Sequence, residues 1–362
     1  MSAFGVYLHI PFCAARCDYC AFATWTDRDH LIDRYLEAMR ADIARAVGDG
    51  MPAATSVFVG GGTPSLVPAD ALAEVIASVP TTADAEVTVE CNPDDVDAAS
   101  VATLVDGGVD RLSVGVQSTS AHVLAALGRG HDRTHVDHAV EVIRASGIRS
   151  FNLDLIYGAA GESVEDWRST VEHVLHLEPP HVSAYGLMVE PGTPLAADER
   201  RHPDDDDQAD KYHLVDELLS TDGLENYEVS NWARPGHESV HNRLYWAQGD
   251  YLGVGCAAHS HVDGRRWWNV RTPERYIDLV ERGAPTEAAH EVLDDATRRT
   301  ERLQLSLRTR DGVERAAFDP DTLTLLDGLV TEHPEDEARV VLTRGGRLLA
   351  NDISTRFADA DR

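Results

Sequence analysis

Short apolar runs alternate with longer amphipathic stretches from the start of the chain to about residue 225. The clearest amphipathic stretch covers residues 30–47, where Leu31, Tyr35 and Met39 recur every four residues, the spacing of one helix face. Six such strand–helix units in a row favour a parallel sheet with right-handed crossovers. A TIM barrel has eight units, so we expect an α/β protein with an open, partial (β/α)6 barrel of the TIM type. The six predicted strands cover residues 6–9, 56–60, 87–90, 111–116, 151–156 and 181–185.

The remainder of the chain has a different pattern. From Tyr227 it is rich in aromatic residues and glycine, which predicts loops and short strands, and after Glu291 a helical pattern covers residues 296–307. The segment VVLTRGGRLLAN (340–351) has a β-like pattern and resembles the wing of a winged-helix module. We therefore expect a barrel, an aromatic and glycine-rich segment, and a C-terminal α+β accessory domain of winged-helix-like type that packs against the barrel. The expected ranges of these three parts are 1–225, 226–290 and 291–362.

Composition and charge narrow the class of protein. Hydrophobic residues make up 43% of the 362 residues, enough for a large buried core. The chain carries 62 acidic and 32 basic residues, a formal net charge of -30, which argues against binding to nucleic acid or to anionic membranes. The chain lacks the long apolar run of a membrane span, and its start lacks the features of a signal peptide. We therefore expect no transmembrane segment and a cytoplasmic location.

Three of the five cysteines lie close together, as Cys13, Cys17 and Cys20. An odd total with one tight group is unlike a disulfide framework and indicates a metal site in a reducing compartment. The spacing C-x3-C-x2-C directly after a strand predicts ligands for three irons of a [4Fe–4S] cluster, which leaves one iron without a protein ligand. A zinc site with His9 as the fourth ligand is the alternative. The other two cysteines stand alone and are expected to be packed thiols.

Polar side chains and glycines gather where the predicted strands end. A glycine triplet at 60–62 exposes backbone groups after the second strand, while Glu90, Gln117 and Asp154 lie at or near the ends of the next three. Taken singly, each of these polar side chains favours a structural role as a hydrogen-bond partner. In a parallel barrel all strand ends open onto one face, so together with Arg129 they are expected to surround one cavity beside the cluster. Their donors and acceptors suit a nucleoside that bears an amino acid, whose amine and carboxylate would bind the open iron.

Seven stretches resemble the radical S-adenosylmethionine (SAM) proteins, and among them the coproporphyrinogen oxidase-like branch. These stretches are YLHIPFCAARCDYC, VFVGGGTPS, EVTVECNPDD, RLSVGVQS, LGRGH, NLDLIYG and HVSAYGLMVEPGTPL. The resemblance runs over residues 4–350 and implies a partial (β/α)6 barrel with a C-terminal accessory domain, in agreement with the strand count. It also implies that Cys13, Cys17 and Cys20 bind the cluster. The residues that it implies as SAM contacts are Tyr7, Gly61, Gly62, Thr63, Glu90, Gln117, Arg129 and Asp154.

The branch contains two functional classes, an oxygen-independent coproporphyrinogen III oxidase and a haem chaperone without that activity. In the oxidases a fourth cysteine lies two residues after the third, where this chain has Phe22. The oxidases also have a long extension before the first strand, whereas about five residues precede the first predicted strand here. The stretch HNRLYW (241–246) is similar to the HNxxYW haem-binding signature of the chaperones. These three features favour the chaperone, with the oxidase or a related radical SAM enzyme as the alternative.

By this resemblance the haem contacts are His241, Asn242, Tyr245 and Trp246, with His259 as a second candidate ligand. A neutral imidazole is a common axial ligand of haem iron, and aromatic side chains can pack on the macrocycle. We therefore expect a [4Fe–4S] cluster, SAM and haem, with haem-accepting proteins as partners. Transient contact with membrane-bound acceptors is left open, as is catalysis, for which no residue is assigned. A simple electron-transfer protein is disfavoured because its cluster would normally need four protein ligands.

Overall fold

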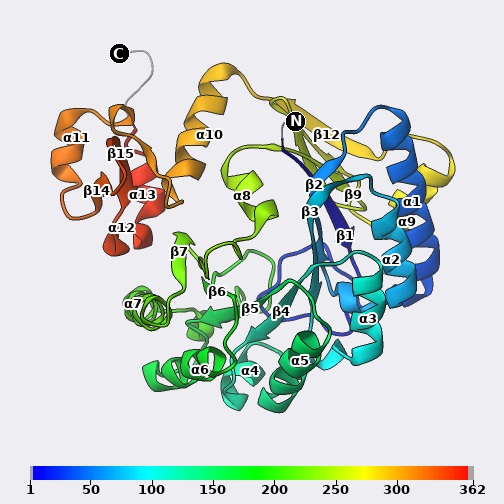
Figure 1. Ribbon diagram of the computed structural model, residues 1–362, viewed down its shortest axis with the longest axis horizontal. Coiled ribbons are helices and arrows are strands. Elements are labelled where there is room, and N and C mark those ends of the chain that lie inside the picture. The colour runs from blue at the N-terminus through cyan, green and yellow to red at the C-terminus, as the bar shows by residue number, and fades with distance from the viewer. Residues whose placement is uncertain (1–2, 358–362) are drawn as a thin grey trace.

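Six parallel strands form the centre of one twelve-stranded sheet in the computed structural model, which describes residues 3–357. They neighbour one another in chain order, and helices on the outer face connect them (Figure 1). The six predicted strand–helix units are thereby confirmed. The strands are β1 (Phe4–Ile10), β2 (Ala54–Gly61), β3 (Thr81–Cys91), β4 (Arg111–Gln117), β5 (Ser150–Tyr157) and β6 (His181–Gly186).

Along these strands, apolar side chains that face the helices alternate with polar side chains that face the barrel interior. On β4, Leu112, Val114 and Val116 are buried in the core beneath the helices, while Arg111 and Ser113 line the interior. The covering helices are α1 (Ile32–Gly48), α2 (Ala69–Ala77), α3 (Ala98–Asp106), α4 (Ala121–Ala126), α5 (Arg133–Ala145), α6 (Val164–His176) and α7 (Asp205–Thr221). Short 3₁₀ helices cover Asp29–Leu31, Pro64–Leu66, Pro93–Asp95 and Glu199–Arg201.

The barrel is open, as the unit count predicts. Beyond β1 the sheet continues with β9, β10, β11 and β12, and beyond β6 with β8 and β7, so the two ends of the six-strand core are not paired with each other. The aromatic and glycine-rich segment therefore extends the sheet on both sides. Its elements are β7 (Glu225–Glu228), β8 (Asn231–Ala233), α8 (Val240–Trp246), β9 (Asp250–Val254), β10 (His259–Val262), β11 (Arg265–Asn269), α9 (Pro273–Glu281) and β12 (Glu287–Val292).

The C-terminal part has its own three-stranded sheet, in the order β13-β15-β14, and its own apolar core around Leu307, Phe318 and Val340. Its elements are α10 (Asp295–Leu307), β13 (Val313–Glu314), a 3₁₀ helix (Arg315–Ala317), α11 (Pro320–Leu325), β14 (Val330–His333), β15 (Asp336–Leu342), α12 (Arg344–Leu348) and α13 (Ala350–Ser354).

One prediction for this part is wrong. Residues 340–351 do not form a wing, because β15 ends at Leu342 and Thr343 caps a helix there by accepting a hydrogen bond from the N–H of Gly346. The antiparallel hairpin lies one element earlier, as β14 and β15.

The C-terminal part packs against the barrel, as expected. Arg347 of α12 lies 2.9 Å from the Asp216 carboxylate of α7, and Arg344 contacts the same carboxylate. On the other side, α10 packs on α8 (Figure 1). Among the described helices none is both long and apolar enough to cross a lipid bilayer.

Candidate functional site

The three predicted cluster ligands lie on the loop that follows β1. Backbone hydrogen bonds close the loop at its base: the N–H of Cys13 donates to the carbonyl of Trp25 (3.1 Å), and the N–H of Trp25 donates to the carbonyl of Pro11 (2.8 Å). Cys13 is buried at this base, whereas Cys17 and Cys20 are half-buried, and all three are free thiols. The loop therefore presents three sulfur ligands at the carboxyl end of a barrel strand.

Hydrogen-bond donors from two neighbouring loops approach two of these sulfurs. The Thr63 hydroxyl lies 3.6 Å from Sγ of Cys13, and the Arg129 guanidinium lies 3.5 Å from Sγ of Cys17. Such donors stabilise thiolates and the sulfurs of an iron–sulfur cluster. Gly62 permits the close approach of Cys13, because a Cβ there would lie 3.1 Å from its Sγ and 2.6 Å from a backbone carbonyl oxygen. The donor set therefore fits a [4Fe–4S] cluster.

The zinc alternative lacks its expected fourth ligand. The buried ring of His9 has Nε2 3.0 Å from the Ala23 carbonyl oxygen and Nδ1 3.1 Å from the Tyr7 hydroxyl. Within residues 3–357, no three Cys, His, Asp or Glu side chains converge closely enough to hold a single metal ion. Thiolates around a multi-iron cluster lie farther apart than the ligands of one ion, so this arrangement suits a cluster better than zinc.

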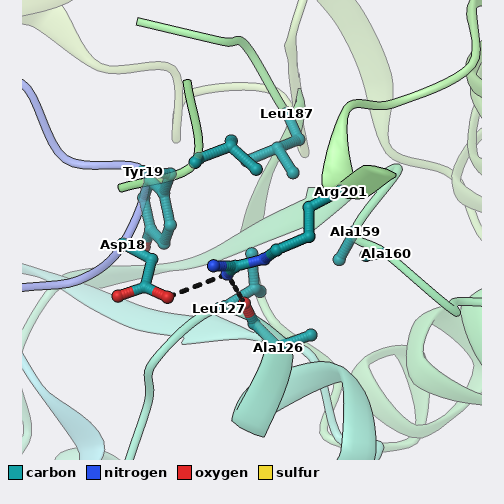
Figure 2. Close-up of a pocket in the computed structure, with 9 residues that line it drawn as sticks. Asp18, Tyr19, Ala126, Leu127, Ala159, Ala160, Leu187 and Arg201 are labelled. Atoms are coloured by element: carbon teal, nitrogen blue, oxygen red, sulfur yellow. Dashed lines mark hydrogen bonds and ion pairs between the residues drawn. The ribbon is translucent and has the colours of Figure 1, made fainter. Parts of the chain in front are cut away.

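A segment after β6 closes the outer side of the cysteine loop (Figure 2). Arg201 points its guanidinium at the loop and donates to the Asp18 carboxylate (2.8 Å) and to the carbonyl of Ala126 (2.7 Å). The N–H of Leu195 adds a hydrogen bond to the Asp18 carbonyl (3.0 Å). The cysteine loop is thus held by the barrel on one side and by this segment on the other.

The barrel interior contains a cavity of about 240 Å³ beside the cysteine loop. Four of the predicted SAM contacts line it: Tyr7, Gly61, Glu90 and Asp154. The N–H of Gly61 donates to the Glu90 carboxylate (3.2 Å), and the φ of +112° at Gly61 is one that only glycine adopts easily. A Cβ at Gly61 would also lie 2.4 Å from the ring of His9, so this glycine is sterically required.

The cavity is rich in hydrogen-bond acceptors. Burial, together with the nearby Asp154 carboxylate, raises the pKa of Glu90 to about 7, and burial raises the pKa of Asp154. The Asp154 carboxylate accepts hydrogen bonds from Ser113 and Asn152 (both 2.8 Å), while Oδ1 of Asn152 is buried without a partner among the described residues. Such a wall suits a ligand with an ammonium group and hydroxyl donors, which is the chemistry of SAM.

The other four predicted SAM contacts surround the cysteine loop instead. Gly62 and Thr63 lie against Cys13, as described above. Arg129 donates to the carbonyl of Gly115 (3.0 Å) and to the Asn92 side chain (2.6 Å) as well as to Cys17. Gln117 lies beside it at the end of β4, with a φ of +63° that is strained for a residue with a side chain. Four of the eight residues thus line the cavity and the others lie on neighbouring loops, and their role in binding SAM stays a prediction.

Sequence reasoning missed several cavity residues. Arg111, Asn152 and His181 point inward, with one nitrogen of Arg111 2.7 Å from Nδ1 of His181. Their positions in the sequence could have identified them, because they alternate along β4, β5 and β6 in the same inward-facing set as Ser113, Asp154 and Ser183. The further lining residues that the sequence analysis did not single out are Phe58, Tyr185 and Ser239. Phe22, which stands where the oxidases have a fourth cysteine, also lines the cavity.

The HNRLYW stretch forms α8, which begins where the Ser239 side chain accepts from the N–H of Asn242 (3.2 Å). His241 on this helix is fully buried. Its Nδ1 lies 2.9 Å from the Ser56 hydroxyl and its Nε2 lies 2.8 Å from the Tyr245 hydroxyl, so in this arrangement both ring nitrogens have protein partners. Burial lowers the pKa of His241 to about 3, which keeps the ring neutral at physiological pH.

The structure divides the remaining predicted haem contacts between two faces. Asn242 and Tyr245 line the interior cavity, whereas Trp246 lines a separate groove on the outer side of α8. His259 lies on β10, where its exposed ring stacks on Trp268 with centroids 5.6 Å apart. The role of these residues in haem binding stays a prediction.

An open six-unit parallel barrel with a three-cysteine loop at its carboxyl end defines a protein of the radical SAM class. In agreement, residues 7–174 match the family model of the radical SAM superfamily. The chain belongs to the HemW family within this superfamily. It is 40% identical to the heme chaperone HemW of Mycobacterium tuberculosis, over 97% of this chain and 93% of the relative. It is 33% identical to the heme chaperone HemW of Bacillus subtilis, over 98% of each chain.

A solved structure has the same fold. The coproporphyrinogen III oxidase HemN from Escherichia coli superposes with a TM-score of 0.84, covering 100% of this chain and 91% of the oxidase. The sequence identity to this oxidase is 24%, so the likeness carries the fold and not the activity.

Proposed function

We propose that this chain is a haem chaperone that binds haem as cargo and transfers it to acceptor proteins. The observation that carries the proposal is the 40% identity to a heme chaperone over nearly the full length of both chains, which includes the HNRLYW helix. A second support is Phe22, an apolar side chain at the mouth of the cavity where the oxidase pattern requires a thiol. The proposed site of action is the cytoplasm, since free thiols that bind a cluster suit a reducing compartment.

In this proposal Cys13, Cys17 and Cys20 hold a [4Fe–4S] cluster, and SAM contacts the open iron and the cavity wall. When bound, the cluster would supply an iron site for the amine and carboxylate of SAM. The chain's own residues then have distinct tasks. Arg129 and Thr63 donate to the cysteine sulfurs, while Glu90, Asp154 and the other predicted SAM contacts hold the nucleoside by hydrogen bonds.

His241 is the proposed axial ligand of the haem iron. Its burial favours the neutral imidazole, the form that coordinates iron. Coordination through Nε2 requires the Tyr245 hydroxyl to give up its hydrogen bond, so this hydroxyl regulates the availability of the ligand. Asn242, Tyr245 and Trp246 are proposed to contact the macrocycle, and His259 is the alternative ligand because its ring is exposed.

The proposal is tested by titrating the anaerobically reconstituted protein with haem and following the Soret band. Apomyoglobin is then added as a probe acceptor. We expect saturable binding of one haem per chain and transfer to apomyoglobin. Absence of saturable binding would overturn the proposal.

A further inference from the structure

A groove lies between α8 and the C-terminal part. It has a volume of about 420 Å³, within the range of about 300–1,000 Å³ that is typical of small-molecule sites. One wall is the outer face of α8, from Val240 to Ala247, and the other comes from the loop after α10 and from Arg339 on β15. Backbone bonds fix the wall opposite α8, because the N–H of Val229 donates to the carbonyl of Arg308 and the N–H of Arg310 donates to the carbonyl of Tyr227. The groove is therefore a built feature of the fold.

Guanidinium groups gather at this groove although the chain carries a net charge of -30. Arg243, Arg310 and Arg339 line it, and Asp311 is the lining residue that carries a negative charge. Arg243 lies 3.9 Å from the Asp311 carboxylate, a distance too long for a strong ion pair, and its side chain is 49% exposed. Arg339 donates to backbone carbonyls of residues 311 and 312 (both 2.8 Å) and so retains its full charge.

Arg310 is the arginine of this set that is well paired. It lies 2.7 Å from the Glu238 carboxylate and 3.3 Å from that of Glu225. With these two acids and Asp311 counted, the three lining arginines carry no excess charge, so the affinity for an anion rests on the placement of Arg243, which has only a long contact to Asp311, and of Arg339, which is bonded to neutral carbonyls. Guanidinium groups bind carboxylates through paired hydrogen bonds, so the preferred ligand carries carboxylates at its edge.

The same groove offers an apolar and aromatic wall. Leu244, Val240 and the indole of Trp246 lie along α8, and the guanidinium of Arg308 stands 6.0 Å from the centroid of the Trp246 ring. A flat apolar body packs well on such a surface. The groove thus combines one apolar wall with two available cations, which is the complement of a planar molecule that has carboxylates on one edge.

We propose that this groove binds the cargo tetrapyrrole by its propionates, with Arg243 and Arg339 holding the carboxylates and Trp246 contacting the ring. The inference rests on the proposed function and assigns a carboxylate-binding site to residues on two parts of the chain that no motif connects. The groove lies on the outer side of α8, whereas Nε2 of His241 contacts Tyr245 at the interior cavity, so the inference does not require His241 as the iron ligand.

The test measures Kd for haem and for haem dimethyl ester, in which the carboxylates are masked. We expect the double variant Arg243→Gln/Arg339→Gln to weaken haem binding by about tenfold or more, because a hydrogen bond to a charged group is lost at each site. Binding of the dimethyl ester should change by less than about twofold. The control Arg34→Gln removes an exposed arginine that pairs with Glu281 on the far side of the barrel, and it should leave both values unchanged.

Arg243→Gln alone repeats the test with a side chain whose loss disturbs no backbone contact, in case the double variant fails to fold. An unchanged Kd for haem in Arg243→Gln and in a folded double variant would show that the groove does not bind the haem carboxylates. Haem binding by the wild type would still support the proposed function. Equal losses for haem and for its dimethyl ester would also overturn it, because the effect would then not depend on the carboxylates. Absence of haem binding by the wild type would overturn the proposed function itself.

Discussion

The hydroxyl of Tyr245 lies 2.8 Å from Nε2 of His241, one helical turn away on α8. The Ser56 hydroxyl occupies the other nitrogen of the same ring. The ring of His241 is thus fully buried with both nitrogens hydrogen-bonded, so the proposed coordination of haem iron by Nε2 requires the bond to Tyr245 to open. In the proposed complex Tyr245 therefore competes with haem iron for Nε2.

Replacing Tyr245 with Phe should strengthen coordination of haem by His241, because Nε2 no longer has to release a partner. His241→Ala should remove the coordination and weaken haem binding while the cluster remains. Both effects are read from the Soret maximum and from the Kd in a haem titration. His259→Ala tests the alternative ligand, and His122→Ala, at an exposed histidine outside the proposed site, is the control. If His241→Ala leaves the spectrum and the affinity unchanged, His241 is not the ligand.

Cys17→Ser should abolish the visible absorbance of the reconstituted cluster and its iron content, because one of three ligands is lost. The barrel should remain folded by circular dichroism, since Cys17 lies on a half-buried loop outside the core. Cys91→Ala is the control: this buried thiol contacts the carbonyl of Ser113 (3.6 Å) and should leave the iron content unchanged. Equal iron content in Cys17→Ser and the wild type would contradict the cluster assignment.

Arg201→Gln should leave the cluster able to form but make it less stable in air, because the ion pair to Asp18 no longer closes the outer side of the cysteine loop (Figure 2). We expect the half-life of the cluster absorbance to fall severalfold. The neighbouring Arg200, whose side chain is 88% exposed and pairs with Asp198, provides the control variant Arg200→Gln. The same half-life in both variants would show that Arg201 does not position the loop.

The raised pKa of Glu90 predicts a pH dependence of stability. In the folded protein its pKa is about 7, above the ordinary value of 4.5, so between these values the folded state binds more protons than the unfolded state. The contribution of Glu90 to stability is thus full below about pH 4.5 and is lost as the pH rises to about 7.

Glu90→Gln removes this titration and keeps an acceptor for the N–H of Gly61. Without bound ligand, the variant should be more stable than the wild type at pH 8 by up to about 3 kcal/mol, and the difference should shrink toward pH 5. Urea unfolding at the two pH values measures this difference. The same variant should bind SAM more weakly. A stability difference that does not depend on pH would contradict the assigned burial of the charge.

The barrel could be predicted from sequence because the evidence for it is local. Each strand alternates or runs apolar over a few residues, and the cysteine spacing identifies the cluster loop without knowledge of the fold. The inward side chains Arg111 and His181 follow the same alternation, but a polar residue in a strand does not by itself reveal whether a cavity faces it.

Long-range pairings could not be predicted. The contact of His241 with Ser56 joins residues 185 positions apart, and no local pattern encodes it. The groove at Trp246 depends in the same way on how the C-terminal part packs on α8. At Thr343 the apolar pattern favours a continuing strand, but the side-chain cap starts a helix instead, which is why the predicted wing was misplaced.

A comparison of haem with coproporphyrinogen III distinguishes a chaperone from an oxidase. The reconstituted protein is divided under anaerobic conditions between haem and coproporphyrinogen III, each with SAM and a reductant. If the chain is a haem chaperone, we expect binding of about one haem per chain and no protoporphyrinogen. The joint appearance of protoporphyrinogen and 5′-deoxyadenosine would contradict it, and would mean that Phe22 in place of a fourth cysteine does not prevent oxidase chemistry.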